Sequence, residues 1–175
     1  TLLVDCDQRK PNLHKIFLTS NESGLSNVLA GKISFEDAVK QNIVENLDLL
    51  TSGIRPPNPA ELLASRKMEI FLQQLKEKYE YIILDTPPVV AVTDAQLLSR
   101  CVDGCLLVVS SSQVEKEAAV KARDLLSKVG ANILGAVLNK LEIKEKGYYG
   151  YYYQYYYGED GSRVKKSKKK SRRRK

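Results

Sequence analysis

Short apolar runs alternate with amphipathic stretches along most of the chain. Strands are predicted at residues 2–5, 47–51, 81–85, 106–109 and 133–138. Helices are predicted at 24–30 and 34–39, after Asn58, from Thr93 to about Arg100, and after Ser112. Near-continuous apolar strands that alternate with amphipathic helices are typical of a parallel sheet covered on both faces. The pattern therefore predicts an α/β fold with a doubly wound, mainly parallel sheet.

Capping residues mark where the predicted helices begin. The caps are expected at Ser34 with Asp37, Asn58 with Pro59 and Glu61, Thr93 with Gln96, and Ser112 with Glu115. The longer helix after Asn58 places Met68, Phe71, Leu72 and Leu75 at the spacing of one buried face. Residues 12–18 have a mixed pattern and are expected to form a loop with about one helical turn.

Polar side chains gather where the predicted strands end. Asp5, Asp7, Asp85 and Asn139 all follow apolar runs, and ligands of parallel sheets bind outside the carboxyl ends of the strands. Asp5 and Asp7 are spaced to project from one side of an extended chain. Two such carboxylates can organise Mg²⁺ through its water shell, and Arg9 and Lys10 follow closely enough to meet phosphate. The alternative is a buried strand that runs into a polar loop, with its acids solvated.

The charge is concentrated at one end of the 175-residue chain. Residues 161–175 hold ten Lys and Arg and no acid, so the formal +7 leaves 18 bases against 21 acids, or −3, in the remaining 160 residues. We expect a globular domain over 1–143 and a flexible tail over 144–175. The basic arm at 163–175 is suited to an anionic membrane surface, nucleic acid or an acidic partner. A solubilising terminus without a ligand is the alternative.

The tail also carries eight tyrosines within ten positions. They are Tyr148, Tyr149, Tyr151, Tyr152, Tyr153, Tyr155, Tyr156 and Tyr157. They follow no helical or strand period that would bury them, and glycines on either side favour a mobile segment. An aromatic low-complexity tail that self-associates is one interpretation.

Five segments together resemble the bacterial tyrosine kinases. Residues 2–11 resemble the Walker A′ motif of that family, and 82–88 resemble its Walker B motif. Residues 55–65 look like its segment before the helix that leads to Walker B, and 137–140 look like its adenine-contacting element. Residues 148–157 match its C-terminal tyrosine cluster. The resemblance covers nearly the whole chain.

The resemblance implies a role for each residue of the predicted site. Asp5 and Asp85 would hold Mg²⁺ and its waters, and Asp7 would accept the proton of an incoming tyrosine hydroxyl. Arg9 and Lys10 would contact phosphate or a neighbouring subunit, although a solvated pair is the alternative. Asn139 would meet the adenine ring of ATP, and the eight clustered tyrosines would be phosphorylated.

The resemblance also implies a cellular setting. It points to a cytoplasmic kinase at the inner face of the membrane that autophosphorylates in trans and controls capsular or exopolysaccharide synthesis. A membrane-embedded polysaccharide co-polymerase would activate it, a cognate tyrosine phosphatase would reverse the modification, and copies would assemble into a ring.

One departure from the family concerns phosphate binding. No Gly-x-x-x-x-Gly-Lys-Ser/Thr motif occurs in residues 1–175, and the family carries that loop before its Walker A′ strand. We therefore expect the sequence to be a fragment that lacks the loop and that neither binds ATP tightly nor transfers phosphate. Two other functions stay open, a positioning ATPase of the same fold and a non-catalytic phospho-acceptor or adaptor.

Overall fold

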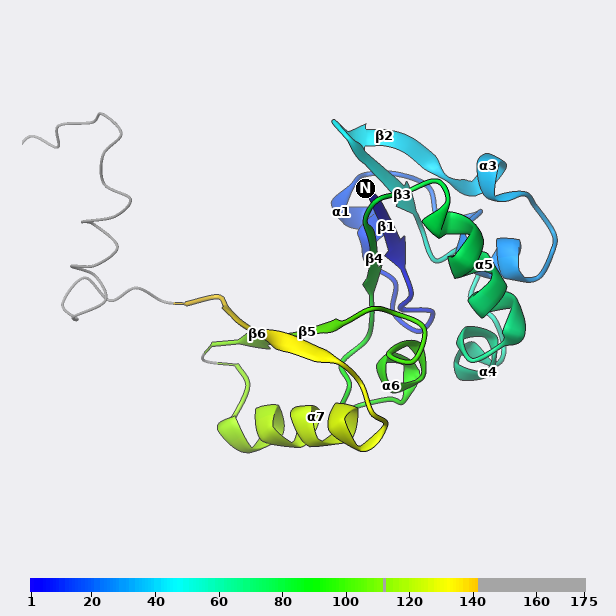
Figure 1. Ribbon diagram of the computed structural model, residues 1–175. Helices are drawn as coiled ribbons and strands as arrows, with labels where there is room; N and C mark the ends of the chain where they lie inside the picture. The colour runs from blue at the N-terminus through cyan, green and yellow to red at the C-terminus, as the bar shows by residue number, and fades with distance from the viewer. Residues whose placement is uncertain (112, 142–175) are drawn as a thin grey trace, which may run out of the picture.

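The computed structural model describes residues 1–111 and 113–141, which form strands and helices in alternation (Figure 1). The strands are β1 (Leu2–Asp5), β2 (Lys40–Val44), β3 (Leu47–Leu50), β4 (Ile82–Asp85), β5 (Cys105–Ser110) and β6 (Ile133–Asn139). The helices are α1 (Leu13–Ile16), α2 (Leu25–Leu29), α3 (Phe35–Ala38), α4 (Pro59–Leu63), α5 (Arg66–Lys76), α6 (Asp94–Leu98) and α7 (Lys116–Lys128). The five predicted strands are therefore confirmed.

The strands form two separate sheets. One has the order β2-β3-β1-β4, in which β1 pairs in parallel with both β3 and β4. The other pairs β5 with β6, also in parallel. The predicted α/β fold with a mainly parallel sheet is thus confirmed, and the predicted flexible tail lies outside the described residues. The division of the sheet into two parts was not predicted.

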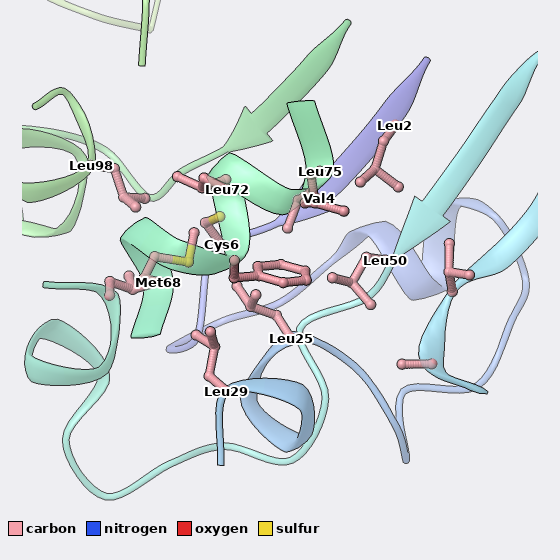
Figure 2. Close-up of a cluster of buried hydrophobic side chains, with 14 residues drawn as sticks. Leu2, Val4, Cys6, Leu25, Leu29, Leu50, Met68, Leu72, Leu75 and Leu98 are labelled. Carbon is pink, nitrogen blue, oxygen red and sulfur yellow. The ribbon is translucent and has the colours of Figure 1, made fainter. Parts of the chain in front are cut away.

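A leucine-rich core holds the first sheet against its helices. Leu2 and Val4 of β1 are fully buried and meet side chains from α2 and α5. Figure 2 shows these side chains converging on the face of β1. Each fully buried leucine of this kind contributes about 1.5–3 kcal/mol, so this core fixes the strand whose end carries the predicted site. Helix α1 lies on the opposite side of β1 from α5 (Figure 1).

A smaller cluster holds the second sheet. Ala122 and Leu126 of α7 are buried and pack with half-buried Leu107 and Ile133 from the two strands. Helix α7 therefore covers one face of β5 and β6. On the other face, Leu106, Val108 and Leu134 are about 60–66% exposed.

Several local expectations need correction. The chain after Asn58 forms two helices rather than one, because Ser65 caps a new helix by accepting the backbone N–H of Met68. Helix α7 has Glu115 at its N-cap, so the predicted cap at Ser112 is wrong; Ser112 itself lies outside the described residues. The cap at Ser34 is confirmed, since its hydroxyl accepts the N–H of Asp37.

Strand β2 was missed because its residues Lys40-Gln41-Asn42-Ile43-Val44 contain no apolar run. It is an antiparallel edge strand that pairs with β3. Edge strands need only one apolar face or none, so the hydrophobic pattern does not reveal them.

Candidate functional site

Two carboxylates stand opposite each other at the carboxyl ends of neighbouring parallel strands. Asp5 ends β1 and Asp85 ends β4, and the two residues are register partners. Adjacent strands lie about 4.8 Å apart, and paired residues of a parallel ladder project from the same face. The apolar runs before them hold both strands in the sheet, so the two acids are placed side by side by the backbone itself.

Backbone N–H groups of the following loop orient Asp5. Its Oδ1 accepts the N–H of Asp7 at 3.1 Å, and its Oδ2 accepts the N–H of Leu13 at 3.2 Å. Asp5 is fully buried. Strand β1 stops at Asp5, so the predicted strand alternation does not extend to Asp7. The loop instead folds back so that its amides meet the Asp5 carboxylate.

Asp7 is held in the same way but keeps one oxygen available. Its Oδ1 accepts the N–H of Arg9 at 3.0 Å and that of Lys10 at 2.9 Å. Within residues 1–111 and 113–141, no donor bonds to Asp7 Oδ2. Asp7 is half-buried, so a ligand can reach that free oxygen.

Burial and neighbouring acids raise the pKa values of Asp5 and Asp85. Burial raises the pKa of Asp5, the N–H groups of Leu13 and Asp7 lower it in part, and the charges of Asp85 and Asp7 raise it further. Desolvation, followed by the charge of Asp7, raises the pKa of Asp85. These directions indicate acids that lie close together and lack sufficient positive charge nearby.

This arrangement fits a hydrated Mg²⁺ better than a fully protein-coordinated ion. In the described part of the chain, no three His, Cys, Asp or Glu side chains group tightly enough to enclose a metal ion. Mg²⁺ usually binds one or two carboxylates and completes its octahedron with waters and phosphate oxygens. Asp85 makes no side-chain hydrogen bond or ion pair with another described residue, and its exposed carboxylate therefore suits a water-shell contact.

Arg9 has a partner that the sequence did not reveal. Its Nε and Nη2 donate to the two carboxylate oxygens of Asp94, each at 2.9 Å. Asp94 is fully buried at the start of α6, whereas the Arg9 side chain is 32% exposed. Lys10 is exposed. The Nε and Nη2 edge of the Arg9 guanidinium is therefore already bonded to Asp94.

Asn139 is not brought to the three acids. It ends β6, opposite Ser110 of β5, and its side-chain oxygen accepts the N–H of Lys140. Figure 1 shows the carboxyl end of β6 well apart from the ends of β1 and β4. The structure thus joins Asp5, Asp7, Asp85 and Arg9 in one place and leaves Asn139 on the second sheet. The eight clustered tyrosines and the basic arm lie outside the described residues.

Sequence reasoning missed two residues of this site. Asp94 lies within the helix predicted from Thr93, and nothing in the local sequence links it to Arg9, its partner 85 residues away. Gln8 is 1% exposed and donates through Nε2 to the backbone carbonyl of Asp5, while its Oε1 is buried with no partner among the described residues. A polar side chain inside an acidic loop gives no sequence signal of its burial.

These features define an α/β protein with an acidic site, suited to a cation, at the carboxyl edge of a parallel sheet. Residues 1–134 match the model of the AAA domain family. The chain is 47% identical over 152 residues to a putative tyrosine-protein kinase, CapB, from Staphylococcus aureus; the match covers 86% of this chain and 67% of that protein. The chain belongs to this AAA-domain family, within its bacterial tyrosine-protein kinases.

Solved structures agree with this assignment. The kinase domain of the Escherichia coli tyrosine kinase ETK superimposes with a TM-score of 0.78 at 35% identity, covering 84% of this chain and 58% of that chain. The septum site-determining protein MinD from Pyrococcus horikoshii OT3, complexed with Mg-ADP, gives a TM-score of 0.65 at 28% identity, covering 82% and 59%. The chain thus spans about two thirds of the CapB relative and less of these two structures.

The helices of the described region are short. None of them is both long and apolar enough to cross a membrane.

Proposed function

We propose that the whole protein is an ATP-dependent protein-tyrosine kinase that phosphorylates the tyrosine cluster at 148–157 of a neighbouring copy. The observation that carries this proposal is the in-register pair Asp5 and Asp85, with the free Asp7 Oδ2 beside it. Family membership supports the same reaction, since a relative at 47% identity is named a putative tyrosine-protein kinase.

Each acid has a role that its hydrogen bonds support. Bound Mg²⁺ and ATP supply the phosphoryl group and the positive charge that offsets it during transfer. Asp5, oriented by two backbone N–H groups, and the unbonded Asp85 hold Mg²⁺ together with its waters. Asp7 accepts the tyrosine hydroxyl proton through Oδ2, while two N–H groups on Oδ1 keep the carboxylate in place.

Nucleotide contacts complete the proposal. Asn139 meets the adenine ring through its amide, which offers both a donor and an acceptor. Because Asn139 lies on the second sheet, this contact requires the adenine to reach the carboxyl end of β6. Lys10, which is exposed beside Asp7, meets phosphate oxygens or a neighbouring subunit.

The setting proposed for the kinase follows from the family resemblance. It works at the inner face of the cell membrane, where a membrane-embedded polysaccharide co-polymerase activates it and a cognate tyrosine phosphatase reverses the modification. Copies form a ring, so that one tail reaches the next active site, and the process regulated is capsular or exopolysaccharide synthesis. The ten bases of residues 161–175 support contact with anionic lipid.

Mass spectrometry of the whole protein after incubation with ATP and Mg²⁺ tests the reaction. We expect phosphate on the tyrosines of residues 148–157 and its loss in Asp7→Asn, which keeps the shape of the side chain but cannot accept the proton. Asp124→Asn is the matched control, because Asp124 is a half-exposed acid on α7, remote from β1 and β4. Phosphotyrosine that persists in Asp7→Asn would remove Asp7 from the reaction.

The same incubation, with the release of inorganic phosphate measured as well, separates two other functions. The MinD structure with Mg-ADP favours a positioning ATPase as the second candidate; it predicts ATP hydrolysis without phosphotyrosine. A phospho-acceptor or adaptor predicts neither hydrolysis nor self-modification, and phosphotyrosine only when a separate kinase is added.

A further inference from the structure

The Arg9–Asp94 pair joins two segments that carry the acids of the site. Arg9 lies four residues after Asp5 in the loop that follows β1, and Asp94 begins α6, nine residues after Asp85 at the end of β4. The contact is bidentate, with both N–O distances at 2.9 Å. Such paired N–H bonds fix the plane of the guanidinium as well as its position.

Because Asp94 is buried, breaking this contact costs free energy. Asp94 is fully buried, and Arg9 is the sole cation bonded to it among the described residues. Removing the cation from a buried carboxylate strongly destabilises a protein, because it leaves a buried charge without a partner. A phosphate group would therefore have to displace Asp94 before it could take the same guanidinium edge, so phosphate binding is a poor role for Nε and Nη2 of Arg9.

The pair is connected to the Asp7 carboxylate through the Arg9 backbone. The backbone N–H of Arg9 donates to Asp7 Oδ1 at 3.0 Å, and the neighbouring N–H of Lys10 donates to the same oxygen. When Asp94 holds the Arg9 side chain, the Arg9 backbone is held with it, and so is the Asp7 carboxylate.

We propose that Arg9 and Asp94 form a positioning clamp that sets the Asp7 carboxylate relative to Asp85. The role of Asp7 as proton acceptor rests on the proposed function, whereas the ordering of the loop does not. Neither clamp residue touches the reacting atoms. The clamp acts through the two N–H groups on Asp7 Oδ1, and a displacement of about 1 Å at such a group costs about 100-fold in rate.

A double-mutant cycle in the whole protein tests the clamp through kinetics. Arg9→Gln and Asp94→Asn are each expected to lower kcat for tyrosine phosphorylation by about ten- to a hundredfold, with KM for ATP changed less than about twofold. The double variant should fall no further than the worse single variant, because both remove one contact. Arg9→Lys should restore part of kcat, since it keeps the charge but not the bidentate bond.

Matched controls come from an exposed pair of the same chemistry. Arg123 donates to Asp124 on the surface of α7, so Arg123→Gln and Asp124→Asn should leave kcat unchanged. A rise in KM for ATP confined to Arg9→Gln, with Asp94→Asn behaving as wild type, would overturn the clamp and make Arg9 a phosphate ligand. Wild-type kcat in both clamp variants would overturn it as well.

Amide hydrogen exchange gives a readout that does not depend on activity. In Arg9→Lys and Asp94→Asn the N–H groups of Arg9 and Lys10 should exchange at least tenfold faster, whereas those of β3 should not change. Unchanged exchange at Arg9 and Lys10 would refute the clamp even if activity fell. A wild-type protein that makes no phosphotyrosine would refute the proposed function instead, and faster exchange in the variants would still support the clamp.

Discussion

Replacing Gln8 with leucine is expected to stabilise the protein. Gln8 is 1% exposed, its Nε2 makes one long hydrogen bond of 3.3 Å to the Asp5 carbonyl, and its Oε1 has no partner in the part of the chain that the structure describes. An unpaired buried acceptor costs about 1–3 kcal/mol, and a long neutral bond returns about 1 kcal/mol or less. Leucine removes the unpaired oxygen and loses less rotamer entropy on burial. The free energy of unfolding should rise by about 1 kcal/mol.

Urea unfolding followed by circular dichroism measures this change. The midpoint should rise at unchanged m-value, and Tm should rise by about 2–4 °C for a chain of this size. Gln73→Leu is the matched control, because Gln73 is exposed on α5 and should change stability by less than about 0.5 kcal/mol. A loss of about 1 kcal/mol or more in Gln8→Leu would refute the reasoning, since it would show that the glutamine is better bonded than its side-chain contacts indicate.

Four further predictions concern the site, the core, the uncovered sheet face and the nucleotide. The pKa of Asp85 is raised in the folded protein, so the free energy of unfolding falls as the pH rises from the ordinary aspartate pKa through the raised one. Asp85→Asn should therefore stabilise the protein at pH 7 but not at pH 3, by less than about 1 kcal/mol because the group is exposed. Thermal unfolding at both pH values measures this difference. Tyr79→Phe should cost about 1.5–3 kcal/mol in urea unfolding, because the Tyr79 hydroxyl donates to a carboxylate oxygen of Asp48 at 2.6 Å. Val108→Lys should reduce concentration-dependent association in light scattering without lowering Tm, because Val108 is 60% exposed on an uncovered sheet face. Residues 1–175 alone should bind Mg²⁺–ATP only weakly in calorimetry, because they contain no phosphate-loop motif; tight binding would refute that prediction.

The sequence predicted elements wherever burial imposes a period. Strands such as Leu2–Asp5 and Ile82–Asp85 are short apolar runs, and the buried face of α5 shows the i, i+3, i+4, i+7 spacing at Met68, Phe71, Leu72 and Leu75. These patterns arise because positions that face the core require apolar side chains. Strand β2 carries no such pattern, since it is an edge strand whose five residues are at most half-buried, and it could not be predicted from periodicity.

The candidate site was predictable only in part for a similar reason. Strand ends are local features, so Asp5 and Asp85 could be placed at one sheet edge before the structure was known. Contacts between segments that are distant in the sequence produce no pattern in the residues around either partner. The bond from Arg9 to Asp94 spans 85 positions, and the placement of Asn139 on a separate sheet depends on which strands pair.

The acids of this site are arranged at a cost to stability, and that cost is informative about function. Asp5 is fully buried, yet its carboxylate is bonded to two N–H groups rather than to a cation, and the charges of Asp85 and Asp7 raise its pKa further. Among the residues that the structure describes, Asp94 is the one buried carboxylate paired with a cation, and its partner Arg9 comes from the loop that holds Asp7. If the acids served only to stabilise the fold, Arg9 would do more by neutralising Asp5 or Asp7. Its use on Asp94 instead leaves the three acids with a deficit of positive charge, which a Mg²⁺ ion brought with a nucleotide would fill.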